Sequence, residues 1–154
     1  MTNQIIFSRD TATVEQLCEH LDECDDSFIP PLSSRVKIPV YANKLHTETI
    51  RFEAWGRQAL VGLVASYQND PNNRHAFISN VSVLTAWRGR GIAGALLDQC
   101  IEEATRAHFS VLVLEVSLSQ SAAVSLYEQR GFKELSATGG VCKMHRPLGC
   151  RINE

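Results

Sequence analysis

The sequence has no excess of either charge: 15 Lys and Arg residues against 17 Asp and Glu give a formal net charge of -2 at pH 7. Nucleic acids and anionic membranes normally bind proteins with a clear cationic excess. Long apolar runs are also missing, because no segment approaches the roughly 20 apolar residues that span a bilayer. The first ten residues lack the features of a signal peptide. We therefore expect neither nucleic acid nor a membrane as a partner.

Closely spaced cysteine pairs are absent too. The five cysteines are scattered, without the spacing of a disulfide framework or a zinc site. Such cysteines suit a reducing compartment, which predicts a cytoplasmic location. Cys18, His20 and Cys24 fall within two helical turns. Without a second ligand cluster they are more typical of an amphipathic helix, so we predict no metal site.

Repeats, low-complexity tracts and linker-like stretches do not occur, so the sequence offers no point at which to divide the chain. Apolar residues make up 44% and charged residues 21%, the balance of a packed globular protein. A chain of 154 residues fits one ordinary domain. We predict a single domain over residues 1–154.

The apolar periodicities of the first half of the chain predict a strand, a helix and a hairpin. These elements are expected at residues 4–8, 13–23, and 49–55 with 59–67 around Gly56 and Arg57. Between them, the prolines and serines of residues 27–39 predict an irregular segment, with a short helix starting at Pro39. A turn is expected at residues 69–73.

The second half alternates strands and helices. Strands are expected at residues 75–84, 111–116, 132–135 and 141–145, with helices from residue 91 and at 121–129. The run at 111–116 is almost wholly apolar, as in a strand buried on both faces. Together these elements predict an α/β (α+β) protein with helices on both faces of a mixed sheet.

A glycine-bearing loop precedes the long helix and reads Arg88-Gly89-Arg90-Gly91-Ile92-Ala93. Backbone N–H groups at such a strand-to-helix junction, together with the helix dipole, can hold a phosphate. The arginines can add charge-assisted contacts to a diphosphate. Gly89, Gly91 and Gly94, followed by Glu115, also match a dinucleotide-binding fingerprint. That reading is disfavoured because the motif comes late in the chain and leaves too few residues for further βαβ units.

Four motifs occur together in order: Val81-Ser82-Val83, Arg88-x-x-Gly91-x-Ala93, Leu114-Glu115-Val116, and Ala123-x-x-Leu126-Tyr127-x-x-x-Gly131-Phe132. This pattern resembles the GNAT N-acetyltransferase superfamily, and it covers roughly the last half of the chain. The resemblance implies the GNAT fold, with a mostly antiparallel mixed sheet of about six or seven strands and about four helices. It also implies acetyl-CoA as the acetyl donor.

The resemblance further implies where acetyl-CoA binds. Its pyrophosphate is expected on the loop from Arg88 to Ala93, and its pantetheine arm along the backbone of Val81 and Val83, where two strands separate. The N–H near Val81 is the implied oxyanion donor. Family members usually carry Asn where this sequence has Gln120, which makes Gln120 a weaker candidate for the cofactor arm.

Acetyl transfer to an amine requires a base for the amine and an acid for the departing thiolate. The resemblance implies Tyr127 as the acid, since it places the hydroxyl beside the cofactor sulfur. Glu115 is the candidate base, as in members that resemble ribosomal-protein N-terminal acetyltransferases. Burial inside an apolar strand is expected to increase its basicity. A strand glutamate can also be a surface residue, in which case ordered water would relay the proton.

The acceptor is predicted to be the primary amine of a small molecule, either an amino sugar or an amino-acid-like metabolite. Its pocket is expected at residues 25–37 and the helix after Pro39, where Asp25, Asp26 and Arg35 can pair with charged groups or lie solvated. A protein N-terminus as acceptor and a non-catalytic acetyl-CoA-binding module are the alternatives. The fold also permits a homodimer.

Overall fold

The computed structural model describes residues 4–68, 72 and 74–149. A seven-stranded sheet with the order β1-β2-β3-β4-β5-β7-β6 forms its centre. The strands are β1 Ile6–Arg9, β2 Ile50–Gly56, β3 Ala59–Tyr67, β4 His75–Val83, β5 Val111–Ser117, β6 Lys133–Thr138 and β7 Val141–Pro147. The helices are α1 Val14–Cys24, α2 Ile38–Glu48, α3 Ile92–Arg106 and α4 Ser121–Gln129. The predicted turn at residues 69–73 lies, apart from Asn72, outside the described residues.

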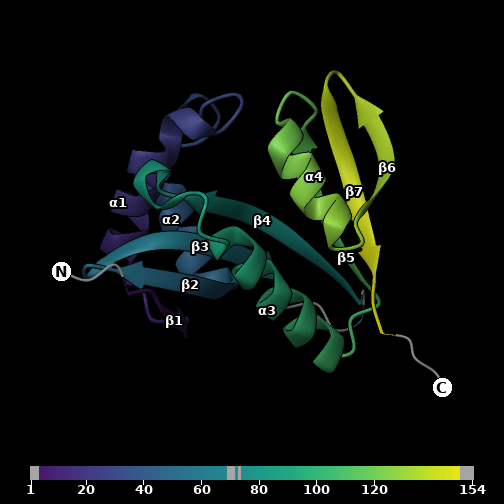
Figure 1. The fold of residues 1–154 in the computed structure, drawn as a ribbon, viewed down its shortest axis with the longest axis horizontal. Coiled ribbons are helices and arrows are strands. Elements are labelled where there is room, and N and C mark those ends of the chain that lie inside the picture. Colours follow the sequence, from purple (N-terminus) through teal and green to yellow (C-terminus); the bar gives the residue numbers. More distant parts are fainter. Residues whose placement is uncertain (1–3, 69–71, 73, 150–154) are drawn as a thin grey trace.

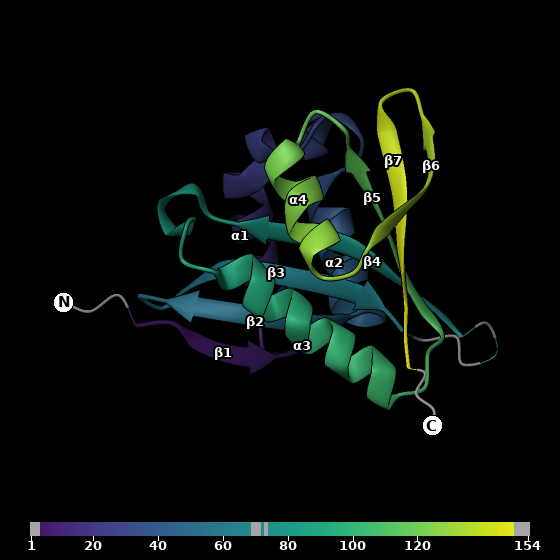
Figure 2. The same ribbon diagram turned by 45° about the vertical axis from the view of Figure 1, so that its right-hand side comes forward.

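All neighbouring strands are antiparallel except β4 and β5, which run parallel. Helices α1 and α2 pack together on one face of the sheet, while α3 lies across the other face, and α4 lies beside β5 and β7 (Figures 1 and 2). The predicted fold class, a mixed and mostly antiparallel sheet flanked by about four helices, is confirmed.

Helix α1 begins where the sequence supplies a capping box. The hydroxyl of Thr13 accepts a hydrogen bond from the backbone N–H of Gln16 at 3.1 Å, and the Gln16 side chain accepts from the Thr13 N–H at 2.9 Å. Such reciprocal bonds satisfy two donors that the first turn leaves unpaired. Leu17 and Leu21 lie on the buried face, as their spacing predicts.

The segment between β1 and α1 is tied to the sheet through a buried carboxylate. Glu53 is fully buried and accepts hydrogen bonds from the N–H groups of Thr11 at 3.0 Å and Ala12 at 3.1 Å. Arg51, also buried, lies 3.5 Å from Glu53 and donates to the carbonyl of Leu45 at the end of α2. A buried charge is costly unless it is paired in this way. The pair therefore fixes β1 and α2 against β2.

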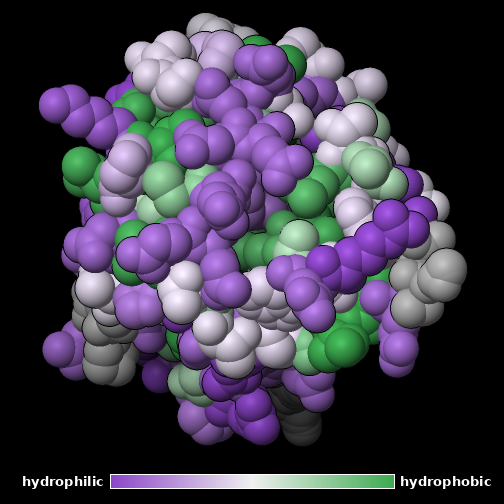
Figure 3. All heavy atoms as spheres, turned by 90° about the vertical axis from the view of Figure 1, so that its left-hand side faces the viewer, coloured by the Kyte–Doolittle hydropathy of each residue, from purple (hydrophilic) through white to green (hydrophobic). Residues whose placement is uncertain are grey.

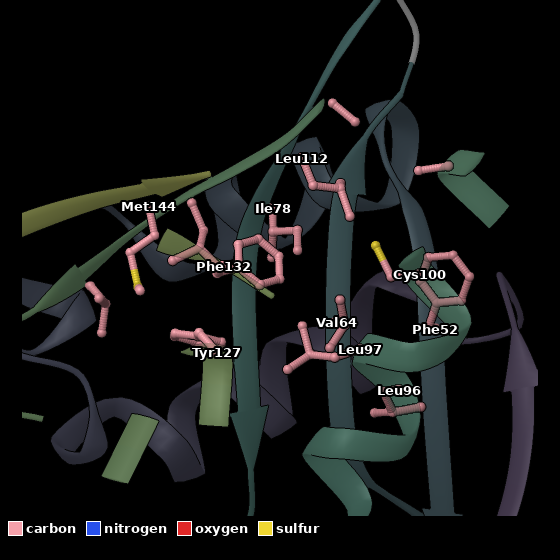
Figure 4. Close-up of a cluster of buried hydrophobic side chains, with 14 of the residues drawn as sticks. Phe52, Val64, Ile78, Leu96, Leu97, Cys100, Leu112, Tyr127, Phe132 and Met144 are labelled. Carbon is pink, nitrogen blue, oxygen red and sulfur yellow. The ribbon is translucent and has the colours of Figure 1, made fainter. Parts of the chain in front are cut away.

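The core falls into two clusters on either side of the sheet. One lies between the sheet and α1 and α2, and the other lies under α3 and α4. Figure 4 shows the second cluster, in which Tyr127, Phe132 and Met144 lie at one end and Leu96, Cys100 and Phe52 at the other. Among the described residues, no helix is long and apolar enough to cross a membrane.

The segment between α1 and α2 is more regular than the sequence predicts. It contains two short 3-10 helices, η1 Asp25–Ser27 and η2 Leu32–Ser34, before α2 begins at Ile38. The prolines prevent a longer helix here, but single turns bonded i to i+3 still form between them.

Figure 3 shows the face of the molecule that lies on the left in Figure 1. On this face, polar side chains surround separate apolar patches.

Candidate active site

The parallel pairing of β4 and β5 stops halfway along both strands. Only His75, Ala76 and Phe77 pair with β5, opposite Val111, Leu112 and Val113. Beyond them, residues 78–83 pair with β3 alone and residues 114–117 pair with β7 alone. We call this region, residues 78–83 and 114–117, the β4–β5 fork. It contains Val81 and Val83, whose backbone groups on the β5 side have no ladder partner among the described residues.

A bulge opens the fork. Ala65 pairs with Asn80 and Ser66 with Ile78, so Ser79 is the extra residue on β4. A bulge bends its strand and increases the local twist. The hydroxyl of Tyr41 on α2 lies 2.7 Å from the Ser79 Oγ and donates to the Ser79 carbonyl at 3.2 Å. Burial raises the pKa of Tyr41, so this hydroxyl stays protonated and holds the bulge in place.

The loop at the end of β4, from Arg88 to Ala93, has the backbone features of an anion site, and we call it the candidate anion site. After the short 3-10 helix η3 Thr85–Trp87, Gly89 and Gly91 adopt positive φ angles of 79° and 76°. A side chain is strained in this region, whereas glycine adopts it freely. Helix α3 then starts at Ile92 with no side-chain cap. Its first N–H groups have no intrahelical acceptor, so they and the positive end of the helix dipole are available to an anion.

The loop from Arg88 to Ala93 rests on the sheet below it. A Cβ at Gly56 would lie 2.4 Å from the buried Trp87 ring, so the hairpin between β2 and β3 can support Trp87 only because residue 56 is glycine. The guanidinium of Arg90 lies 4.7 Å from the centre of the Trp87 ring. Ile92 is buried against Gly62. Ile92 can therefore contribute its backbone to the loop but not its side chain.

One residue of η1 connects both sides of the fork. The Oγ of Ser27 accepts a hydrogen bond from Arg88 at 2.6 Å, and its carbonyl accepts one from the side chain of Gln120 at 2.9 Å. Arg88 also donates to the carbonyl of Val83 at 3.2 Å. Gln120 immediately precedes α4. The segment after α1 thus reaches two of the predicted cofactor residues, which the sequence gives no means to foresee.

Tyr127 faces the core from α4. It is 6% exposed, and its ring meets Phe132 edge-on with 6.0 Å between ring centres (Figure 4). Burial raises the pKa of Tyr127 to about 12. Its hydroxyl has no hydrogen-bond partner among the described residues. A protonated donor is therefore present beside the fork, and no described residue accepts its proton in a hydrogen bond.

The expected burial of Glu115 is wrong, because its side chain is exposed. Leu114 and Val116 on either side of it point into the cluster that contains Tyr127. Since successive side chains of a strand point to opposite faces, Glu115 lies on the other face of the sheet. The structure therefore does not bring Tyr127 and Glu115 into contact. It places them on opposite faces of the sheet at the same fork.

The residues expected to form the acceptor pocket differ in their availability. Asp25 accepts hydrogen bonds from the N–H of Ser33 at 2.7 Å and from its hydroxyl at 2.6 Å, and these bonds lower the pKa of Asp25. Asp25 thus links η1 to η2. Asp26 and Arg35 are exposed.

A buried polar chain beneath β4 escaped the sequence-based prediction. His20 on α1 contacts the carbonyl of Leu60 through Nδ1 at 2.9 Å, and its Nε2 lies 2.8 Å from the hydroxyl of Ser82. That hydroxyl donates to Asn80 at 2.7 Å. Burial lowers the pKa of His20 to about 4, so the ring is neutral. The only signal in the sequence was a histidine on the apolar face of a helix.

Thiol chemistry finds no support at this site. Burial raises the pKa of Cys24 to about 11 and that of Cys100 to about 12. The thiolate is the reactive form, and these groups hold their protons. Cys24 lies 3.8 Å from His20, but no three histidine, cysteine or acidic residues of the described chain are grouped as metal ligands.

The chain is similar in sequence to two characterised groups of N-acetylating enzymes. N-acetylaspartate synthetase from Xenopus tropicalis is 37% identical over 86 residues, which is 56% of this chain and 30% of that protein. The [ribosomal protein bS18]-alanine N-acetyltransferase of Escherichia coli strain K12 is 37% identical over 59 residues, 38% of this chain and 40% of the relative. The chain thus matches well under half the length of these relatives.

The fold is shared over a longer stretch. The crystal structure of the ribosomal-protein-S18-alanine N-acetyltransferase from Escherichia coli superposes with a TM-score of 0.76, covering 96% of both chains at 21% identity. The sequence model described as the acetyltransferase (GNAT) family matches residues 14–132, which include both the fork and the candidate anion site. The chain therefore belongs to the GNAT acetyltransferase family.

Proposed function

We propose that this protein is an acetyl-CoA-dependent N-acetyltransferase, a single domain over residues 1–154, that acetylates the primary amine of a small molecule. The observation that supports this most directly is the placement of Tyr127 and Glu115 on opposite faces of the β4–β5 fork. A thioester held in the fork would have a proton donor on one side and a proton acceptor on the other. The membership in the GNAT family supports the same activity.

The residues at the fork fit acetyl-CoA. The two left-handed glycines, Gly89 and Gly91, have nothing within 4 Å of where a Cβ would stand, so a pyrophosphate can approach their backbone. The N–H groups of Ile92 and Ala93 and the side chains of Arg88 and Arg90 would complete that site. The β5-facing backbone of Val81 and Val83 would pair with the pantetheine arm. Gln120 would reach the arm after releasing Ser27.

When bound, acetyl-CoA supplies an acetyl group activated as a thioester. Glu115, directly or through a water, accepts a proton from the incoming ammonium so that the nitrogen can attack. The N–H near Val81 stabilises the negative charge on the carbonyl oxygen. As the new carbon–nitrogen bond forms and the carbon–sulfur bond breaks, Tyr127 gives its proton to the sulfur. The nitrogen loses two protons in total, of which one restores Tyr127 and one leaves to solvent.

The acceptor class rests on the relatives. N-acetylaspartate synthetase, by its name, forms an acetylated amino acid, and its similar segment covers 56% of this chain. An amino-acid-like metabolite is therefore the favoured acceptor, ahead of an amino sugar. A small acceptor also fits the cytoplasmic location that we propose from the unpaired buried cysteines. A homodimer stays a prediction that no described contact tests.

Acetylation of a protein N-terminus is the second candidate. It is favoured by the similarity to the alanine N-acetyltransferase of Escherichia coli and by Glu115 on the open face of the sheet. Both candidates share an α-amine as nucleophile. They differ in the group bonded to the α-carbon, which is a carboxylate in a free amino acid and an amide in a peptide.

Isothermal titration with acetyl-CoA and, separately, with NAD tests the proposal first. We expect micromolar binding of acetyl-CoA, about −8 kcal/mol, and none of NAD. Coenzyme A release is then measured with free amino acids, amino sugars and short peptides. Turnover of amino acids supports the proposal, and turnover of peptides alone supports the second candidate. Binding without turnover of any amine would identify a binding module, and binding of NAD alone would overturn the assignment of the loop.

A further inference from the structure

The face of the sheet on which Glu115 lies carries two rows of side chains that cross three strands. Directly paired residues have their side chains on the same face. Glu115 on β5 pairs with Lys143 on β7, which pairs with Ser136 on β6. One rung away, Val113, His145 and Lys133 are paired in the same order. Beside the one carboxylate of these rows there are thus two lysines and a histidine.

Glu115 and Lys143 are backbone partners in the sheet, but their side chains do not form an ion pair. Side chains at such positions have Cβ atoms about 4.5–5.5 Å apart, close enough for an ion pair. Yet neither residue takes part in a hydrogen bond through its side chain or in an ion pair with any described residue. Both are exposed. A carboxylate and an ammonium group are therefore available side by side at the mouth of the fork.

The floor beside these charges is apolar and lies open. Tyr67, Phe77 and Val113 form a row across β3, β4 and β5 on the same face, and Phe77 is 37% exposed. Helices α1 and α2 pack on β2, β3 and β4. They leave the Glu115 face of β5, β7 and β6 accessible, so a small molecule can reach the charges and the floor together.

We propose that Lys143 is the residue that selects acceptors with a free α-carboxylate, which deepens and rests on the proposed function. A free amino acid is a zwitterion, with an ammonium and a carboxylate on one carbon. Its ammonium group binds at Glu115, where it loses a proton, and its carboxylate binds at Lys143. Lys133, in the neighbouring row, adds to the positive potential around the carboxylate. The side chain of the amino acid lies over Phe77 and Val113. A peptide N-terminus has no carboxylate to offer Lys143.

The test compares alanine, aspartate and phenylalanine with their α-amides, which keep the amine and lose the carboxylate. We expect the Lys143→Met variant to lower kcat/KM for the free acids about tenfold, through KM, while kcat/KM for the amides changes less than about twofold. Comparing each substrate between variants removes the difference in amine basicity between acids and amides. The charge-reversed Lys143→Glu variant should lower kcat/KM for the free acids further and should prefer the amides as substrates.

Arg106→Met serves as the matched control, because it removes one exposed positive charge at the far end of α3, where Arg106 forms an ion pair with Glu103. It should leave both substrate series unchanged. Lys143 is exposed, so the variants should keep the melting temperature of the parent protein. If the Lys143 variants lower kcat/KM equally for acids and amides, or leave kcat/KM for the acids unchanged, Lys143 does not select the carboxylate. The proposed function would remain intact in either case. No turnover of any amine by the parent protein would overturn the proposed function, and this assignment with it.

Discussion

The side chain of Tyr127 is buried, and its hydroxyl has no hydrogen-bond partner among the described residues. The hydroxyl oxygen is nevertheless not among the fully buried polar atoms without a partner, so it reaches solvent at one edge. A hydroxyl that reaches solvent can also reach a bound thioester, which favours a chemical role for Tyr127. Because burial raises the pKa of Tyr127 to about 12, the group stays protonated throughout the usual working range of pH.

We expect Tyr127→Phe to lower kcat about 100-fold or more, the usual contribution of a general acid. The variant should bind acetyl-CoA as before, and its free energy of unfolding should stay close to that of the parent, because the hydroxyl makes no hydrogen bond to the described residues. In the parent enzyme, loss of the Tyr127 proton should cause no fall in kcat below about pH 11. Steady-state kinetics, isothermal titration and urea unfolding measure the three quantities. An unchanged kcat would remove Tyr127 from the mechanism.

His20 couples the stability of the fold to pH. Its pKa is about 4 in the folded protein, against about 6.5 in an unfolded chain. Above pH 6.5 the ring is neutral in both states. Between about pH 6.5 and 4, only the unfolded state takes up the proton, so the free energy of unfolding decreases as the pH falls. The loss approaches about 3 kcal/mol near pH 4 and then levels off.

Urea unfolding of the parent protein and of His20→Gln at several pH values between 7 and 4 measures this effect. The variant should be less stable at pH 7, since it disturbs the contacts with Leu60 and Ser82. The difference in stability between the two proteins should shrink as the pH falls. Other carboxylates and histidines contribute to both proteins alike, so a constant difference would contradict the assignment to His20.

At the scale of elements, the hairpin between β2 and β3 supports the candidate anion site. Trp87 packs on Gly56 and carries the guanidinium of Arg90. Gly56→Ala would place a methyl group 2.4 Å from the far edge of the indole ring. Overpacking of this kind costs about 1–3 kcal/mol, and displacement of Trp87 should also weaken acetyl-CoA binding.

Urea unfolding and isothermal titration measure both effects of Gly56→Ala. The double variant Gly56→Ala with Trp87→Phe is the control, because phenylalanine lacks the ring atoms that meet the added methyl group. It should recover part of the stability and of the affinity that the single variant loses. If Gly56→Ala lowers stability but leaves the affinity for acetyl-CoA unchanged, the hairpin does not position the loop.

Across the whole molecule, the sequence predicts local structure better than it predicts contacts. The boundaries of α4 were predicted to the residue, because Gly131 ends a clear helical period just after them. Helix α3 was expected from residue 91 and begins at Ile92, after the αL glycine. These elements depend on neighbouring residues. The order β4-β5-β7 joins strands that lie far apart in the chain, and no periodicity predicts it.

Features that depend on distant residues escaped the sequence. The bulge at Ser79 and the end of pairing after Phe77 leave no mark in the apolar pattern of β4. Periodicity also cannot tell that the outer face of β5 is open, so the burial of Glu115 was predicted wrongly. The contacts of Ser27 join residues 61 and 93 positions further along the chain. Only the folded chain brings such residues together.

Few backbone pairs join strands β1–β4 to strands β5–β7 within the sheet. This scarcity predicts how acetyl-CoA should change the molecule. Three residue pairs join β4 to β5, and Ser27 reaches Gln120 across the open end. Amides of residues 78–83 that face β5 can exchange their hydrogens without unfolding, because they lack a ladder partner. Acetyl-CoA pairing with this edge would protect them and hold the two halves of the sheet together.

Hydrogen exchange with and without acetyl-CoA measures this protection. At 100 times the Kd, we expect exchange at Val81, Val83 and the loop from Gly89 to slow by up to about 100-fold. The exchange rates of amides already in the parallel ladder, such as that of Phe77, should change by a much smaller factor. NAD at the same concentration should leave all of these exchange rates unchanged. Unchanged exchange at Val81 and Val83 while acetyl-CoA is bound would mean that the pantetheine arm does not use the β4 edge, and the fork would then need another occupant.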